Sequence, residues 1–264
     1  MRRLPRGLKE AVGLLLAYNG YEYVRALCGQ ADGTARANAE QIVRVERSLH
    51  VAGEGAVQRW ALGHPSFVQL LDIFYGTAHF IAPAAVLVML WRRRPEQYRL
   101  WRDRLIAITL LALIGFWLWP VAPPRLLPSH YGFVDTDAVL GGMGPLGSGP
   151  GKDLNVNAAM PSLHVGWALW CASAVAATAG RRVRTTGRAT ARHLARKWAA
   201  YAFPLFTFLT VTATGNHYWL DAVGGLVVDW AGYAVGGGLV AAGLARIARL
   251  RPRTRSATLA TDGS

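Results

Sequence analysis

The sequence predicts an all-α membrane protein with six transmembrane helices. Three observations lead to this prediction. Of the 264 residues, 52% are hydrophobic and ten are Trp, a composition unlike that of a soluble protein with an ordinary polar surface. The hydrophobic residues gather in six long stretches, and the basic residues fall in short bursts between them. We therefore expect a helical bundle that forms a single membrane domain.

Each of the six stretches approaches the roughly 20 mostly apolar residues that a helix needs to cross the hydrocarbon core of a bilayer. The expected spans cover residues 9–28, 66–90, 104–121, 161–180, 199–215 and 219–246. Charged residues interrupt the first span, where Glu22 and Arg25 are three apart and can pair on one helical face. No small-residue cleavage site follows this span, so we expect a retained helix and not a signal peptide.

Residues 34–62 precede the second span and predict an amphipathic helix that lies on the membrane surface. Its apolar residues include Ile42, Val43, Val45 and Leu49. Its charged residues include Arg36, Glu40, Arg44, Glu46 and Arg47. At the other end of the chain, residues 251–264 are polar and are expected to be disordered.

The distribution of basic residues predicts the orientation in the membrane. Of the 29 Lys and Arg residues, 22 lie in residues 1–9, 92–104, 181–197 and 246–255. The positive-inside rule places these regions and both termini in the cytoplasm. The opposite, extracytoplasmic face then receives Arg125, Lys152 and the polar residues at the starts of the fourth and sixth spans.

Several other functions are not supported by the composition. A net charge of +14 could suggest nucleic-acid binding, but the charges come in bursts and do not form a basic face. Cys28 and Cys171 each stand inside an apolar stretch, where a thiol acts as a small hydrophobe, so no disulfide framework or CxxC metal site is expected. The Gly-rich run 141–151 before Lys152 departs from a phosphate-binding loop at Leu146, and no strand precedes it.

The first polar segment is Pro-Ser-Leu-His at 161–164. Pro161 suits the first turn of a helix because its missing N–H would have no partner there. The free amides of that turn and the Ser162 hydroxyl can bind an anion, and His164 lies within the same turn. The alternative interpretation is an ordinary helix start with a packed histidine.

The second polar segment is Asn-His-Tyr-Trp-Leu-Asp at 216–221. His217 and Asp221 are four apart and share one face of a helix. A carboxylate that accepts the Nδ1–H of an imidazole leaves a lone pair on Nε2, as a nucleophile or base requires. The alternative is a His–Asp pair that only caps the helix. Ionisable residues at membrane depth are costly and usually functional, which favours a reactive pair.

Taken together, the two segments resemble the PAP2 phosphatase and phosphotransferase superfamily, in which a PSxH motif and a later HxxxD motif lie at the outer ends of adjacent helices. The resemblance covers about 65–246. Residues 159–164 and 214–221, supported by 120–125 and 74–80, are most similar to the inositol-phosphotransferase branch, the relatives of fungal inositol phosphorylceramide synthase.

The resemblance implies a role for each polar residue. His217 would be the nucleophile, Asp221 its orienting carboxylate, and His164 the acid that protonates the leaving oxygen. The phosphate would be held by Ser162 and Arg125. No metal or other cofactor is implied.

Two departures from the family pattern affect the binding of phosphate. The first motif, KxxxxxxRP, is absent, because Leu118 stands where Lys is expected and Leu follows the arginine at position 125. Val211 stands where the family has Arg, six residues before the nucleophile. Candidates to replace these cations are Lys152, Asn216 and His79, although His79 could equally serve as a helix–helix hydrogen-bond donor.

The expected function is therefore that of a lipid-phosphate phosphatase or phosphotransferase at the outer membrane–water interface. Its substrate would be a phospholipid, sphingolipid or polyprenyl phosphate, and the sequence leaves hydrolysis and transfer to an alcohol open. One alternative is a metal-dependent hydrolase with His164, His217 and Asp221 as ligands. A second is a non-enzymatic lipid transporter or scaffold, although the sequence has no inverted repeat.

Overall fold

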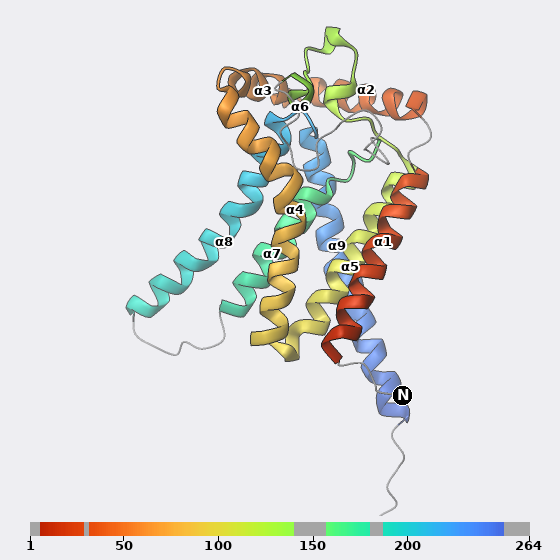
Figure 1. The fold of residues 1–264 in the computed structure, drawn as a ribbon, viewed down its shortest axis with the longest axis vertical. Coiled ribbons are helices and arrows are strands. Elements are labelled where there is room, and N and C mark those ends of the chain that lie inside the picture. The colour runs from red at the N-terminus through yellow and green to blue at the C-terminus, as the bar shows by residue number, and fades with distance from the viewer. Residues whose placement is uncertain (1–5, 29–31, 140–156, 180–186, 251–264) are drawn as a thin grey trace, which may run out of the picture.

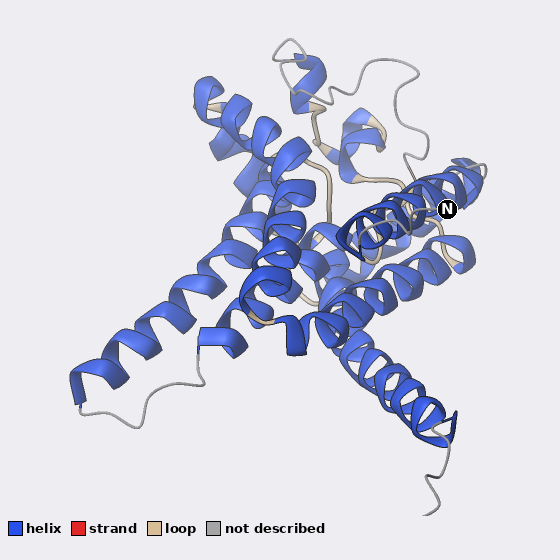
Figure 2. Ribbon diagram, turned by 60° about the horizontal axis from the view of Figure 1, so that its bottom comes forward, coloured by secondary structure: helices blue, strands red, loops and turns tan. Residues whose placement is uncertain are grey.

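The computed structural model describes residues 6–28, 32–139, 157–179 and 187–250. These residues form α-helices and short 3₁₀ turns, and no strand occurs among them (Figure 2). The predicted all-α class is confirmed. The α-helices are α1 (Arg6–Cys28), α2 (Asp32–Ser48), α3 (Glu54–Leu62), α4 (Pro65–Arg93), α5 (Pro95–Leu118), α6 (Thr136–Val139), α7 (Leu163–Ala179), α8 (Gly187–Ala213) and α9 (Trp219–Leu250).

The helices divide into an upright bundle and a cover at one end (Figure 1). Helices α1, α4, α5, α7, α8 and α9 form the bundle, and α2 and α3 lie across its upper end. The bundle helices occur near the six expected spans, except that α5 begins at Pro95 and α8 at Gly187, each inside a basic segment expected to lie between spans. Ala and Arg are the commonest residues in the extension of α8 and favour helix. Lys152 and the tail 251–264 lie outside the described residues.

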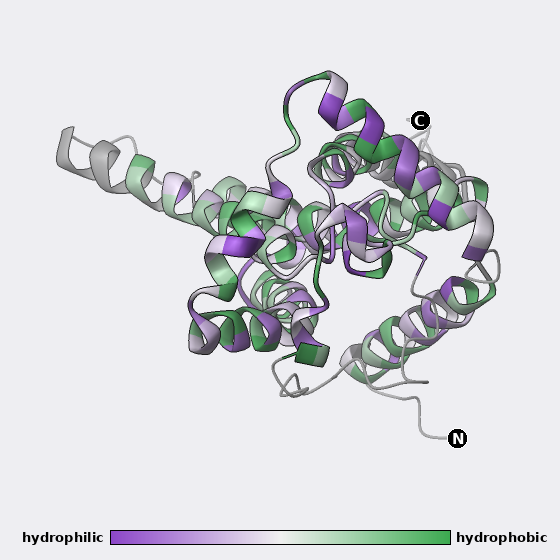
Figure 3. Cartoon of the chain, turned by 90° about the horizontal axis from the view of Figure 1, so that it is seen from above, coloured by the Kyte–Doolittle hydropathy of each residue, from purple (hydrophilic) through white to green (hydrophobic). Residues whose placement is uncertain are grey.

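Membrane crossing is supported by composition for part of the bundle. Within the described residues, α4 alone is long and apolar enough to cross a bilayer, and Leu163–Thr178 is a shorter apolar helix. Large hydrophobic side chains nevertheless face outward on other bundle helices, and Figure 3 shows hydrophobic residues along the helices at the periphery. Six spans therefore stay a prediction.

The amphipathic segment 34–62 differs from the expected single surface helix. It forms two helices, because His50 has a φ of 57° and a right-handed helix cannot continue through that conformation. The apolar face of α2 also packs on the protein itself: Ile42 and Val43 are buried in a cluster that includes Tyr218. Glu46, expected on the polar face, is buried as well.

The centre of the bundle is an aromatic and aliphatic core that joins α5 to α7. Ile108 and Phe116 of α5 pack in one cluster with Trp167 and Trp170 of α7. The Trp170 indole N–H donates to the backbone oxygen of Trp101 at 2.9 Å, which satisfies a polar group that is fully buried. This core fixes the position of α7 relative to the upper end.

Helix α9 packs so closely on α5 that one glycine is required. A Cβ added at Gly236 would lie 2.8 Å from the Cα of Arg104, whereas a Cβ at the neighbouring Gly237 would meet no atom within 4 Å. A backbone atom cannot move aside as a flexible side chain can. The close approach of the two helices therefore depends on the missing side chain at position 236.

We predict that Gly236→Ala destabilises the protein by about 1–3 kcal/mol through overpacking. Gly237→Ala adds the same methyl group at the adjacent position. It should leave the free energy of unfolding unchanged or raise it by up to about 1 kcal/mol, because Ala favours helix. Thermal unfolding of both variants in detergent measures the difference. Equal unfolding midpoints for the two variants would contradict the α5–α9 packing.

Candidate active site

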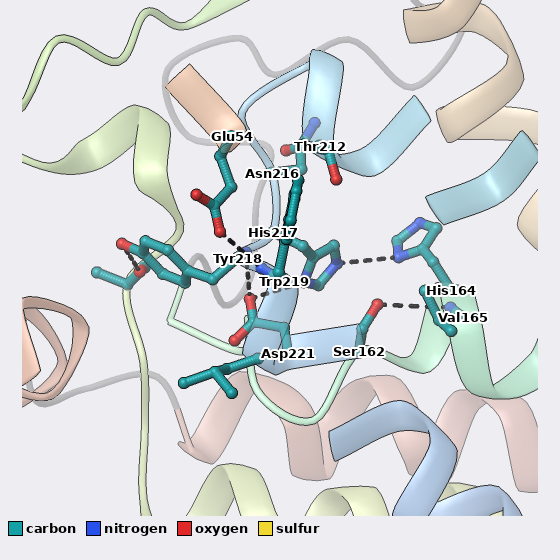
Figure 4. Close-up of polar contacts among 12 residues, drawn as sticks. Glu54, Ser162, His164, Val165, Thr212, Asn216, His217, Tyr218, Trp219 and Asp221 are labelled. Carbon is teal, nitrogen blue, oxygen red and sulfur yellow. Dashed lines mark hydrogen bonds and ion pairs between the residues drawn. The ribbon is translucent and has the colours of Figure 1, made fainter. Parts of the chain in front are cut away.

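Helix α7 begins at Leu163, two residues after Pro161. Ser162 is the residue before the helix, and its Oγ accepts the N–H of Val165 at 3.4 Å, as a capping residue does. Its side chain is fully buried. The Ser162 hydroxyl, expected to hold phosphate, thus lies beside His164 in the first turn of α7 (Figure 4).

The loop between α8 and α9 presents His217 next to this helix start. The backbone N–H groups of Asn216 and His217 both donate to the carbonyl oxygen of Val211, which closes the last turn of α8. Val211 itself is buried. The position where the family pattern has Arg therefore contributes a backbone acceptor and an apolar side chain to the site.

His217 and Asp221 form the predicted hydrogen bond, although they do not share a helix face: His217 lies in the loop before α9, and Asp221 lies in the first turn of α9. The Nδ1 of His217 lies 3.2 Å from Oδ2 of Asp221, and the same oxygen accepts the N–H of Tyr218 at 2.9 Å (Figure 4). His217 is 4% exposed and Asp221 is 0% exposed. A buried carboxylate that accepts the Nδ1–H holds the imidazole in one tautomer and leaves the Nε2 lone pair available.

That lone pair points at the second histidine. The Nε2 of His217 lies 3.4 Å from Nδ1 of His164, and the two rings are inclined at 61° (Figure 4). A group bound to His217 Nε2 would therefore meet a ring nitrogen of His164. This is the geometry that a nucleophile and a general acid require.

The two polar segments are also joined through their backbones. The N–H of Ser162 donates to the backbone oxygen of Asp221 at 2.9 Å. Gly225, one turn further along α9, makes this approach possible, because a Cβ there would lie 2.6 Å from the Ser162 oxygen. Helix α7 therefore starts directly against the first turns of α9, and residues more than fifty positions apart share one site.

An aromatic wall, formed by α4 residues and Trp167, packs against the His164 ring. Tyr75 stacks on the His164 ring with centroids 4.2 Å apart, and His79 stacks on it at 4.1 Å. His79 in turn lies parallel to Trp167 at 4.3 Å. His79 is thus packed between the rings of His164 and Trp167, and His164 separates it from the His217–Asp221 pair.

A cavity opens beside this wall, between α4, α7 and α8. Most of its lining is aromatic or aliphatic, and His164 and His79 are the histidines in it. The lining residues are Phe74, Tyr75, Ala78, His79, Pro83, His164, Trp167, Ala168, Phe203, Thr207, Thr210 and Val211. The cavity therefore reaches His164 from the side of the bundle.

Arg125 reaches the site through Asn216. Its Nε donates to Oδ1 of Asn216 at 2.9 Å, and a terminal nitrogen forms an ion pair with Asp135 at 3.0 Å. Its backbone N–H donates to the oxygen of Gly215. Arg125 therefore supports the residue that precedes His217. Leu118, where the family pattern has Lys, ends α5 and is 74% exposed.

The described residues contain no group of three or more His, Cys, Asp or Glu side chains with the geometry to hold a metal ion. In His217, Nδ1 contacts Asp221 and Nε2 faces His164.

Two site residues were not identified from the sequence. Glu46 of α2 and Glu54 of α3 accept the backbone N–H groups of Leu220 and Trp219 at 2.8 and 2.9 Å. A signal for Glu46 was present: it follows Ile42 by four residues, so it shares the apolar face of the predicted helix. Its charge suggested the polar face instead.

Comparison with known proteins agrees with this geometry. The family model of the PAP2 superfamily matches residues 40–235, which contain both polar segments and both glutamates. The chain therefore belongs to the PAP2 superfamily, whose members are generally phosphatases and phosphotransferases. No curated protein and no solved structure matches the chain.

We predict that Asp221→Asn keeps the fold and lowers turnover of an aryl phosphate by about 10²- to 10⁴-fold, because the amide permits the wrong imidazole tautomer. Asp229→Asn makes the same change two turns later in α9 and should retain activity. Initial rates and thermal unfolding of both variants test this. Near-normal turnover by Asp221→Asn would remove Asp221 from the mechanism.

Proposed function

We propose that the protein is an integral membrane enzyme that hydrolyses or transfers a phosphoryl or phosphoinositol group carried by a lipid. The reaction proceeds through a phosphohistidine at His217. The observation that supports this proposal is the buried chain of contacts from Asp221 through His217 to His164. It gives one imidazole a free lone pair and places a second imidazole where a leaving group would depart.

In the first step, the Nε2 lone pair of His217 attacks phosphorus and forms the N–P bond. The P–O bond to the leaving alcohol breaks, its electron pair stays on the oxygen, and His164 donates a proton to that oxygen. Asp221 stabilises the positive charge that develops on the His217 ring. The negative charge of Asp221 is itself held by the N–H of Tyr218.

In the second step, water or an acceptor alcohol attacks the same phosphorus. His164, now neutral, takes the proton from the attacking oxygen, the N–P bond breaks, and its electron pair returns to His217. One residue thus acts first as acid and then as base, so the rate should depend on pH as a bell-shaped curve whose two limbs belong to the histidine pair.

A lipid substrate is supported by the apolar surroundings of His164. The residues around the cavity beside it come from three bundle helices and are mainly aromatic and aliphatic. An apolar part of a substrate would be favoured against such residues, close to His164. The similarity of residues 159–164 and 214–221 to the inositol-phosphotransferase branch supports a phosphoinositol group. Incubating the purified protein with a lipid extract, and following the loss of a phosphorylated species, would identify the substrate.

A cell-membrane location, with both termini in the cytoplasm, is supported by exposed apolar residues and by charge. Soluble monomers rarely expose large contiguous apolar patches, but Trp117, Leu118, Trp198, Leu205 and Trp230 are all largely exposed. The basic junction between α4 and α5 lies at the lower end of the bundle, opposite the candidate site (Figure 1). We therefore assign the site to the extracytoplasmic side.

The division of labour between the two histidines can be tested with a radiolabelled aryl phosphate whose phenol leaves readily without a proton. His164→Ala should still become phosphorylated and should retain the label, because the second step lacks its base. His217→Ala should give neither turnover nor label. His130→Ala, which changes an exposed histidine, should behave as wild type.

The assay contains EDTA, so loss of wild-type activity would favour the metal-dependent alternative.

The opposite pattern of labelling would reverse the two roles. Label on both variants would reject a phosphohistidine at His217.

The orientation can be tested by cysteine labelling in intact cells. With Cys28 and Cys171 replaced by Ala, a cysteine at Ser129 should react with a membrane-impermeant maleimide, because this residue lies in the 3₁₀ turn Ser129–Tyr131 at the same end as the site. A cysteine at Glu96, in the first turn of α5, should react only after permeabilisation. Reaction at Glu96→Cys alone would overturn the assigned orientation.

A further inference from the structure

The first turn of α9 is held by three carboxyl groups. The consecutive backbone N–H groups of Tyr218, Trp219 and Leu220 donate to Asp221, Glu54 and Glu46 respectively, at 2.9, 2.9 and 2.8 Å. The first amides of a helix have no partner inside the helix, and its positive dipole end favours negative charge. Three successive amides are therefore satisfied by three different acids.

Two of these acids come from outside the bundle. Glu46 belongs to α2 and Glu54 to α3, the helices that lie across the upper end (Figure 1). Glu46 is 1% exposed and Glu54 is 3% exposed. Among the described residues neither carboxyl group has a Lys or Arg partner in an ion pair. Burying an acid without a basic partner costs free energy. The position of Glu46 and Glu54 at these amides therefore requires an explanation.

Glu46 and Glu54 accept from the neighbouring backbone amides of Leu220 and Trp219, so both carboxyl groups lie at the same turn of α9. The pKa of Glu46 is raised from its usual 4.5 to about 8, first by burial and then by the Glu54 carboxyl group, while the N–H of Leu220 acts in the opposite direction. The other titratable groups that face the pair are Asp221 and Tyr218.

We propose that Glu46 and Glu54 act together as positioning residues for the His217–Asp221 pair. They touch neither the reacting nitrogen nor the cavity. They hold the turn of α9 that carries Asp221, and Asp221 in turn orients His217. The covering helices α2 and α3 are thereby part of the catalytic apparatus of the PAP2 fold in this protein.

The geometry explains why small movements would matter. Asp221 Oδ2 accepts from both His217 and Tyr218, so a shift of the first turn changes both contacts at once. A displacement of about 1 Å in a catalytic group can lower a rate by about 10²-fold. Removing the carboxyl group of Glu46 or Glu54 should therefore lower kcat and leave KM nearly unchanged, because the contacts with the substrate remain.

The experiment compares Glu46→Ala with Glu46→Gln. Its activity measurement rests on the proposed function. The amide side chain of Glu46→Gln keeps an oxygen for the Leu220 N–H and imitates the protonated acid, so this variant should keep kcat within about threefold of wild type. Glu46→Ala removes the acceptor and should lose about tenfold or more in kcat. Glu40→Ala, on the same helix, is the matched control. Wild-type kcat in Glu46→Ala, or equal loss in the Ala and Gln variants, would overturn the proposal.

A second arm measures thermal unfolding against pH and needs no activity. The folded protein binds the Glu46 proton more tightly than the unfolded chain, so this contribution to stability is complete below about pH 4.5 and is lost as the pH rises to about 8. Wild type and Glu40→Gln should show this decline, and Glu46→Gln should show a smaller one. An equal decline in Glu46→Gln would contradict the burial of Glu46 at the start of α9.

The two arms separate the two proposals. If the wild-type protein shows no phosphoryl transfer but the unfolding curves differ as expected, the proposed function is wrong and the placement of Glu46 stands. If transfer is normal and the unfolding curves are identical, the carboxyl pair is wrong and the proposed function stands.

Discussion

The hydrogen bond between His217 and Asp221 is the interaction on which the upper end of the molecule depends. It places an ionisable pair where both side chains are almost completely excluded from water. Removing a carboxylate from water costs several kcal/mol unless donors replace the lost water. The N–H of Tyr218 and the start of α9 supply that compensation. The surrounding elements are arranged so that these donors stay in place.

The bundle and the covering helices α2 and α3 position the His217–Asp221 pair in different ways. Helices α5, α7 and α9 pack through small and aromatic residues, which fixes how the start of α7 meets the start of α9. Helices α2 and α3 bring polar groups onto the same turn from the opposite side. The site is therefore assembled between a tightly packed apolar base and a polar cover, and neither part supplies it alone.

The chain keeps the histidine motifs of its family but departs from the family pattern elsewhere. The two positions where that pattern has cations hold Leu118 and Val211, and Arg125 is engaged with Asn216 and Asp135. His164 and His217 stand where the motifs require them. The departures therefore fall on cationic positions and leave the two histidines in contact.

The sequence by itself determined the helical class, the approximate ranges of the bundle helices and the pairing of His217 with Asp221. The length of a hydrophobic stretch and a spacing of four residues are local properties of the chain, so the sequence alone predicts them. The contact of His164 with His217, the stacking of Tyr75 and His79, and the burial of Glu46 were decided by tertiary structure. They depend on how separate helices pack, and a charged residue on an apolar face gains its partner only when another helix supplies the amide.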